Sequence, residues 1–267
     1  MAKQVLGKRT GYPTKYDPKI LVRISRKERR KGYVEMFGVD IWHCYEVSFL
    51  NMKGKPEFCM LRIVNDASNP YIWESKSLKL YLFSLNNEQF ESFTEVLQVI
   101  SHDLSELAGG DVKVWRIANF DMLGITLDAT ECLDHLDVEC SKYTVDPLLL
   151  TRSVAKKNTT YGYYSDLLRS NCEITNQPDW ARVYIRWVAR AITILPESLL
   201  RYIVSYRNHQ EFHEPTCERI YQTLHNAIDP KELLVICQYT RRGGIEINPI
   251  RSSKLNFDTH LVRTWQQ

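Results

Sequence analysis

The chain has 267 residues, of which 44% are hydrophobic and 25% charged, so it can bury the core of one large domain or of two smaller ones. No stretch approaches the roughly eighteen consecutive apolar residues of a membrane-spanning helix, and the first residues lack the apolar run of a secretory signal. The net charge of +3 is too small to indicate nucleic-acid binding by itself, and we expect a cytoplasmic globular protein.

Two strands joined by a glycine-containing turn open the predicted structure. Residues 43–50 and 56–64 alternate between apolar and polar side chains, as half-buried strands do. Residues 90–107 carry apolar side chains at helical spacing and stop at a pair of glycines. Residues 112–118 predict another strand, so the first half runs strand, strand, helices, strand.

The second half is predicted to repeat that order. Residues 183–195 are rich in β-branched and aromatic side chains, which indicates a strand. A helix is expected to start at Pro196, because proline suits the first position of a helix. A second helix over 217–228 and a strand over 233–241 follow, and a glycine pair then turns the chain into IEINP.

The two halves also share residues. Residues 77–89 (SLKLYLFSLNNEQ) and 198–210 (SLLRYIVSYRNHQ) align without a gap and agree at six positions. We infer a duplication, because the matching stretches fall at the same point in the order of elements. The fold class is therefore α+β, with one module over residues 1–140 and a second over 141–267. Each is expected to have an antiparallel sheet with a pair of helices on one face.

Two stretches raise the question of a ligand and receive an ordinary interpretation. Seven scattered cysteines predict free thiols, and among them Cys132, His135 and Cys140 match no common zinc spacing. We expect a linker or an edge strand there, with two incidental thiols and no metal. Residues 23–31 (RISRKERRK) hold six cations and one acid. A phosphate or RNA contact is one interpretation, but we favour a solvated, mobile segment.

The stretch SNCEITNQPDW places Cys172 seven residues before Asp179. A catalytic cysteine must be a thiolate, whereas an ordinary thiol has a pKa of about 8.5. It also needs an acid that protonates the anion created by its attack. Asp179 could be that acid if a strand formed by CEITNQ turns at Pro178. An inert thiol beside a turn carboxylate is the alternative.

The stretch ESKSLKLY offers a ligand-binding carboxylate and two cations. Glu74 could accept two parallel N–H donors, the pattern that a guanine ring presents. Lys76 and Lys79 could bind phosphate. An amphipathic helix start with exposed lysines explains the same residues.

Two later stretches leave similar alternatives open. His213 and Glu214 lie at an expected helix start, so Glu214 either caps that helix or is a second ligand-binding carboxylate, placed like the first in the duplicated module. Arg241 and Arg242 precede two glycines, which suits an anionic cofactor or a solvated hairpin.

Together, ESKSLKLY, SNCEITNQPDW, RYIVSYRNHQEFHE and YTRRGGIEINP resemble the signature segments of the NADPH-dependent 7-cyano-7-deazaguanine reductases, the nitrile reductases of queuosine biosynthesis. The resemblance runs from about Asp40 to the C-terminus and fits the longer, two-module form of the family. It implies the tunnelling fold, NADPH as cofactor, and a small deazaguanine substrate whose nitrile is reduced to an aminomethyl group with two NADPH. It further implies a homodimer that contacts neither nucleic acid nor a membrane.

The resemblance also implies residue roles. Cys172 matches the nucleophile that forms a thioimide with the nitrile carbon, and Asp179 matches the acid that protonates the nitrile nitrogen. Glu74 and Glu214 match carboxylates that hold the deazaguanine ring. The other implied substrate-binding positions are Trp73, Ser75 and His213. The implied cofactor-binding positions are Ser75, Lys76, Arg242 and Gly243.

Two other functions stay open on the sequence. One is a purine- or pterin-ring hydrolase or cyclohydrolase on the same scaffold, which would need a shell of metal ligands. The other is a module that binds tRNA or a nucleotide through the glutamates without chemistry, and only the basic segment 23–31 supports it.

Overall fold

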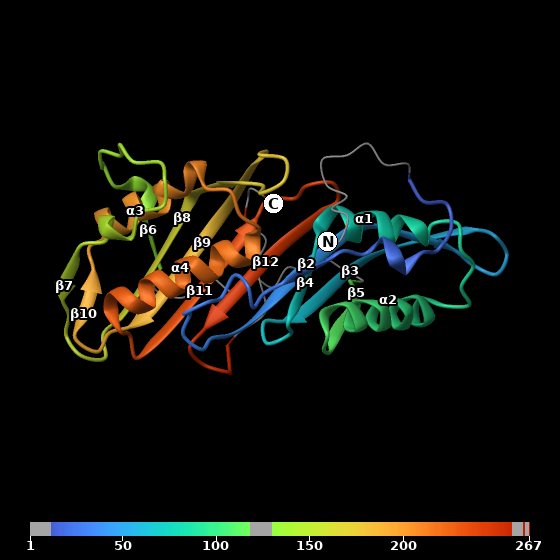
Figure 1. Ribbon diagram of the computed structural model, residues 1–267, viewed down its shortest axis with the longest axis horizontal. Coiled ribbons are helices and arrows are strands. Elements are labelled where there is room, and N and C mark those ends of the chain that lie inside the picture. Colours follow the sequence, from blue (N-terminus) through green and yellow to red (C-terminus); the bar gives the residue numbers. More distant parts are fainter. Residues whose placement is uncertain (1–11, 118–129, 258–263, 265–266) are drawn as a thin grey trace. The chain divides into compact units, whose positions relative to one another are not determined.

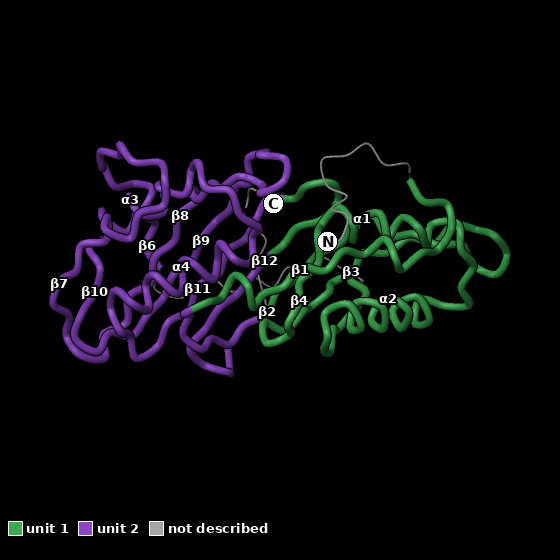
Figure 2. Tube along the Cα trace, viewed as in Figure 1, with its two compact units in different colours: residues 1–31, 39–121, 241–247 green, residues 32–38, 122–240, 248–267 purple. Residues whose placement is uncertain are grey.

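The computed structural model describes residues 12–117, 130–257, 264 and 267, and its elements are labelled in Figure 1. The chain forms two compact units, coloured separately in Figure 2. The first contains residues 1–31, 39–121 and 241–247, and the second contains residues 32–38, 122–240 and 248–267. The expected module boundary at residue 140 lies within the second unit.

The first unit is built on antiparallel strands. β2 (Phe37–Leu50) pairs with β3 (Pro56–Asp66), and β3 pairs with β5 (Val112–Ile117). The short strands β1 (Arg23–Ser25) and β4 (Tyr71–Trp73) form a separate pair. Helices α1 (Ser75–Ser84) and α2 (Phe93–Ala108) cover the apolar face of the longer strands. Their shared core includes Trp42, Val47, Phe49, Leu61, Ile63, Leu78, Tyr81 and Ile100.

The local sequence of helix α2 determines which face is buried and where the helix begins and ends. Its buried residues recur every four positions at Val96, Ile100, Leu104 and Ala108, which places them on one face. The Ser92 hydroxyl oxygen caps the first turn by accepting the Glu95 N–H at 3.3 Å. A glycine in the left-handed conformation ends the helix. The predicted helix over 90–107 is confirmed.

The second unit contains the strand order β6, β8, β9, β11, β12. These strands are β6 (Glu131–Cys132), β8 (Thr160–Asn171), β9 (Pro178–Val188), β11 (Glu232–Tyr239) and β12 (Ile245–Ser252), whose first three residues belong to the first unit. Helices α3 (Pro196–Val204) and α4 (His213–Ile228) share one core with β8, β9 and β11. β7 (Arg152–Val154) pairs with β10 (Ile192–Ile194). Among the described residues, the 3-10 helices are η1 (Pro18–Ile20), η2 (Leu133–His135), η3 (Pro147–Leu149) and η4 (Ser205–Asn208).

Two predictions for the second half need correction. The single strand expected over 183–195 is two strands, because β9 ends at Val188 and the chain bends before β10. β8 was not predicted at all, although it spans 12 residues. A bulge between Ser165 and Leu168 breaks its alternation, so the apolar and polar side chains do not follow one period.

The two units repeat one order of elements. β2, β3, β4, α1, α2 and β5 in the first correspond to β8, β9, β10, α3, α4 and β11 in the second. The bulge of β2 lies between Cys44 and Val47, and that of β8 lies between Ser165 and Leu168. The two bulges are separated along the chain by as many residues as the aligned serines Ser84 and Ser205. Each of these serine hydroxyls donates at 2.6 Å to the carbonyl three residues earlier, that of Tyr81 or of Tyr202. Leu50 bridges Gln89 just as Asn171 bridges Gln210.

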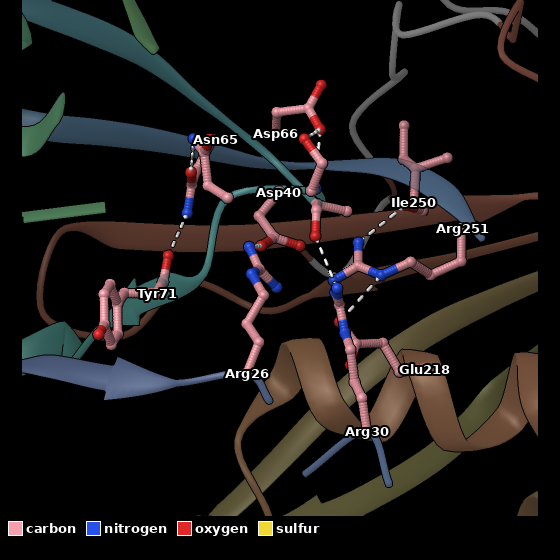
Figure 3. A network of polar contacts seen from close by, with 12 residues as sticks. Arg26, Arg30, Asp40, Asn65, Asp66, Tyr71, Glu218, Ile250 and Arg251 are labelled. Carbon is pink, nitrogen blue, oxygen red and sulfur yellow. Dashed lines mark hydrogen bonds and ion pairs between the residues drawn. The ribbon is translucent and has the colours of Figure 1, made fainter. Parts of the chain in front are cut away.

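Residues 23–31 are not the solvated, mobile segment that we expected. They begin with β1, and the Arg23 guanidinium lies 4.7 Å from the centroid of the Tyr71 ring. Arg26 is only 3% exposed and forms an ion pair with the fully buried Asp40 (Figure 3). The sequence could not predict this buried arginine, because nothing in a run of charged residues distinguishes the one that points inward from its exposed neighbours. Within the described residues, no helix is both long and apolar enough to cross a membrane.

Replacing Arg26 by methionine should lower the free energy of unfolding by about 3–5 kcal/mol, because it removes the guanidinium from a buried carboxylate. Urea unfolding measures this loss. The exposed neighbour Lys27 provides the control, and Lys27→Met should change stability by less than about 0.5 kcal/mol. Equal losses in the two variants would contradict the structural role of Arg26.

Candidate active site

Cys172 and Asp179 lie at the closed end of the hairpin formed by β8 and β9. β8 ends at Asn171 and β9 begins at Pro178, so CEITNQ is the hairpin loop and not the strand that we expected. The Cys172 N–H donates to the carbonyl of Gln177 at 2.9 Å, which closes the loop at its base. Cys172 and Asp179 thus flank one short hairpin loop.

The register of the hairpin places both side chains on one face. Asp179 pairs with Ser170, two residues before Cys172. Because side chains alternate along a strand, Ser170 and Cys172 share the face of Asp179, and diagonal neighbours on one face have Cβ atoms about 7–8 Å apart or less. Cys172 is 7% exposed and Asp179 is 2% exposed. A small reacting group can therefore lie between a sheltered thiol and a sheltered carboxyl.

The matching hairpin of the first unit shows how side chains at these two places meet. Asn51 follows the last residue of β2 as Cys172 follows that of β8, and Glu57 follows the first residue of β3 as Asp179 follows that of β9. The Asn51 amide donates to the Glu57 carboxylate at 3.0 Å. A hairpin end of this kind can therefore bring side chains at these two positions into contact.

Helix α4 brings two more of the expected residues to this hairpin end. His213 begins the helix, and its Nε2 lies 3.4 Å from Oδ2 of Asp179. The imidazole ring is stacked on the ring of Tyr239, with centroids 3.7 Å apart and planes at 5°. Glu214 follows in the first turn and is 2% exposed. The N-cap is Phe212 and makes no side-chain hydrogen bond.

A buried ion pair and a thiol contact hold α4 against the strands of the second unit. Arg251 of β12 donates to Glu218 of α4 at 2.6 Å, and both side chains are buried (Figure 3). The Cys217 thiol lies 3.8 Å from the carbonyl oxygen of Val235 on β11. These contacts fix the helix one turn beyond Glu214, so the first turn has little freedom to shift.

Two polar atoms around the hairpin end, Asn171 Oδ1 and His213 Nδ1, are buried and make no hydrogen bond within the described part of the chain. Buried polar groups in native proteins are nearly always hydrogen-bonded. The hairpin end therefore offers polar atoms that a ligand could satisfy.

The carboxylate of Glu74, in the first unit, caps helix α1. Its two oxygens accept the N–H groups of Lys76 and Ser77 at 2.9 and 2.8 Å. Burial raises the pKa of Glu74, and the two backbone hydrogen bonds partly oppose that rise. Each carboxylate oxygen keeps further acceptor capacity. In the order of elements Leu195, and not Glu214, corresponds to Glu74, because Leu195 precedes α3 as Glu74 precedes α1.

The glycine turn of the first unit lies beside the middle and second half of α1, where Gly243 lines a small pocket with Lys79, Leu82 and Phe83. Gly243 has φ +56°, which favours glycine, and a Cβ added there would lie 2.9 Å from Nζ of Lys79. Lys76 stands three residues before Lys79 and so shares its face of α1. Ser75, Lys76, Arg242 and Gly243 thus belong to neighbouring segments of one unit. Lys79 itself is paired with Glu46 at 3.5 Å.

Trp73 is part of the core of the first unit, where it is 2% exposed and packs against Trp42 at a centroid distance of 5.5 Å. Its Nε1 is buried and makes no hydrogen bond among the described residues. Cys132 and His135 lie in β6 and η2. Within the described ranges, no group of three or more His, Cys, Asp or Glu side chains is arranged as metal ligands.

Sequence reasoning did not single out Tyr239 and Ser170. Both stand inside quoted motifs, YTRRGGIEINP and SNCEITNQPDW, so the signal was present in the sequence. It could not be used, because only the strand register shows that these side chains face the thiol and the acid.

Comparison with known proteins identifies the family. Residues 12–115 match the family model described as nitrile reductase, 7-cyano-7-deazaguanine-reductase N-term, and residues 178–256 match one described as QueF-like protein. A protein of Legionella pneumophila (strain Paris) is 43% identical over 98% of this chain and 94% of its own, and is named NADPH-dependent 7-cyano-7-deazaguanine reductase. The chain belongs to the family of NADPH-dependent 7-cyano-7-deazaguanine reductases.

Two further reductases of the same name agree with this assignment. One from Cupriavidus pinatubonensis is 41% identical over 95% of this chain and 93% of its own, and one from Acinetobacter baylyi is 40% identical over 98% of each. A solved archaeosine synthase QueF-like, in the apo form, matches 41% of this chain and 96% of its own at 19% identity and a TM-score of 0.31, too low to support an inference. The family predicted from the four motifs is confirmed, and the chain is an oxidoreductase.

The pKa shift of Glu74 predicts a pH dependence of stability. Because its folded pKa is raised above the ordinary 4.5, the carboxylate costs folding free energy once the pH rises through that folded value, and the cost is absent below 4.5. Glu74→Gln does not ionise. Urea unfolding at pH 4 and pH 7 should therefore show the variant gaining stability relative to the wild type as the pH rises. A difference that does not vary with pH would contradict the shift.

Proposed function

We propose that the chain reduces the nitrile of 7-cyano-7-deazaguanine to 7-aminomethyl-7-deazaguanine, with two NADPH per turnover. The relatives at 40–43% identity, which align over nearly their whole length, are named for this activity. The structural observation that supports it is the sheltered pair of Cys172 and Asp179 at one hairpin end, with the imidazole of His213 against the carboxylate.

In the first step the thiolate of Cys172 attacks the nitrile carbon. A C–S bond forms as one C–N π bond breaks, and Asp179 gives a proton to the nitrogen, so the product is a neutral thioimide. A carboxyl positioned in advance is valuable here, because an unprotonated nitrogen anion would be costly in a buried site. The imidazole of His213, 3.4 Å from Asp179, is placed to return a proton to that carboxylate.

Reducing a nitrile to a primary amine takes up two hydrides and two protons, which accounts for two NADPH. NADPH, when bound, supplies a hydride to carbon. Cys172 leaves as a thiolate after the first reduction, which frees an imine and restores the nucleophile for the next turnover. Burial of Cys172 and Asp179 excludes water, which would otherwise hydrolyse the thioimide or the imine.

The residues of the first unit fit a pyridine dinucleotide. Phosphate groups bind well at helix N-termini and next to cations, and α1 begins with Ser75 and Lys76. Arg242 and Gly243 lie in the turn that approaches Lys79 of the same helix, where the backbone conformation favours glycine. We assign these four residues to cofactor binding. Within the same unit, Trp73, Glu74 and Ser75 are proposed substrate contacts.

In the second unit, His213 and Glu214 are the proposed substrate contacts. A buried carboxylate accepts two parallel N–H donors of a guanine-like ring with high selectivity, since an analogue lacking them leaves its oxygens unsatisfied. Glu214 has the required burial.

The assembly and location are also proposals. The repeated order of strands, helices and bulges supports two duplicated modules of the tunnelling fold, divided near residue 140. We propose that the chain acts as a homodimer in the cytoplasm, and that it needs no direct contact with nucleic acid because its substrate is a free base. Sedimentation of the purified chain tests the dimer.

Cys172→Ala should abolish both turnover and covalent capture of the substrate while leaving the protein folded. Intact-mass analysis of wild-type protein mixed with 7-cyano-7-deazaguanine, before NADPH is added, should show the mass gain of one nitrile. Cys140→Ala, which removes another thiol of the second unit, should keep the adduct. An adduct that survives in Cys172→Ala would refute the assigned nucleophile.

Glu214→Ala should weaken substrate binding by about 10- to 100-fold, because ring N–H donors then lose their acceptor. Calorimetric titration in the Cys172→Ala background measures binding without chemistry. Glu197 provides a matched control, since it also lies in the first turn of a helix but is exposed. If Glu197→Ala weakens binding as much as Glu214→Ala, Glu214 has no specific contact with the ring.

A further inference from the structure

We infer that Tyr239 is a positioning residue for this reaction, because its ring holds the imidazole of His213 in the orientation that faces Asp179. The inference rests on the proposed function of Cys172, Asp179 and His213. It assigns a role to a side chain that none of the sequence motifs distinguished from its neighbours.

The strand register places Tyr239 on the face of the reacting residues. It is the last residue of β11 and pairs with Ala181 of β9, two residues after Asp179. Since side chains alternate along a strand, Tyr239 and Asp179 point to the same side of the sheet. Tyr239 is fully buried and belongs to the core shared by α3, α4 and the strands. Its ring is therefore a rigid surface.

The imidazole of His213 rests on that surface. The two centroids are 3.7 Å apart and the planes are nearly parallel at 5°. The terminal torsion of a histidine side chain has a broad minimum, so nothing in its own covalent structure fixes the ring plane. A flat ring beneath it removes this rotation. The electron-rich face of a tyrosine also attracts an imidazolium, as does the carboxylate at Nε2.

The fixed plane decides where both ring nitrogens point. With Nε2 at 3.4 Å from Asp179, Nδ1 is directed elsewhere, and it is buried without a hydrogen bond among the described residues. An imidazole that is free to rotate would lose the contact between Nε2 and Asp179, and either Nδ1 or Nε2 could then face the carboxylate. Tyr239 thus keeps one nitrogen on the proton donor and the other available to a ligand.

The ring of Tyr239, and not its hydroxyl, carries this role. It is the ring that stacks on the imidazole of His213, with centroids 3.7 Å apart. Burial is the largest cause that raises the pKa of Tyr239 well above its ordinary value, so the group stays neutral while the reaction proceeds. Phenylalanine should therefore replace it with little loss, whereas a non-planar side chain should not.

The test compares Tyr239→Phe, Tyr239→Leu and the unbranched, flexible Tyr239→Met with the wild type. Tyr221→Leu serves as the control, since Tyr221 is a fully buried tyrosine of α4 that is not in the site. Folding is checked by urea unfolding, and kcat, KM and the rate of adduct formation without NADPH are measured for each folded variant.

Tyr239→Phe should keep kcat within about threefold, because it keeps the ring. Tyr239→Leu and Tyr239→Met should lower kcat and the adduct rate on the order of 10²-fold, the cost of misplacing a reacting group by about 1 Å, with a smaller change in KM. Tyr221→Leu should lose stability and retain kcat.

Three results would overturn the inference: a loss in Tyr239→Phe as large as in Tyr239→Leu, full kcat in a folded Tyr239→Leu or Tyr239→Met, or an equal loss of kcat in Tyr221→Leu. Failure of the proposed function is distinct from all three, since the wild type itself would then form no adduct and oxidise no NADPH. In that case the positioning role of Tyr239 is refuted together with the proposed function.

Discussion

The pairing of Ser170 with Asp179 across the β8–β9 hairpin is the constraint on which the site depends. A slip of this register by one residue would turn Asp179 outward and bring its neighbour Trp180, now 37% exposed, to the inner face. The thiol would then face an indole. The hydrogen bond at the base of the loop and the ladder between β9 and β11 together prevent this slip.

Unsatisfied polar groups at the candidate site lower the stability of the fold. An amide oxygen and an imidazole nitrogen are buried at the hairpin end without hydrogen bonds in the described part of the chain. A dense apolar core offsets that cost. The Trp187 ring stacks on Tyr161 at 5.4 Å, and fully buried side chains of α3 and α4 pack on the same strands. The candidate site residues are thus held by a rigid core before any ligand is present.

The sequence predicted what depends on local pattern or on motifs. Helix α2 follows from apolar residues at intervals of four and from a left-handed glycine, and the family follows from four short stretches. β8 was missed because its bulge interrupts the alternation on which strand prediction relies. The contact of His213 with Tyr239, and the pairing of Arg26 with Asp40, depend on which side chains point inward from separate elements. No spacing along the chain encodes that.

The hairpin of the first unit has a further consequence. Asn51 and Glu57 stand where the second unit has Cys172 and Asp179, and they use the same geometry for an ordinary amide–carboxylate hydrogen bond. A chain with two such hairpins therefore has a thiol at this position in one hairpin and not in the other. On the proposed mechanism, substrate forms one covalent adduct for each chain, however many chains assemble. The hairpin with Asn51 and Glu57 has no thiol and takes no part in the proposed covalent chemistry, so its side chains can contribute to stability alone.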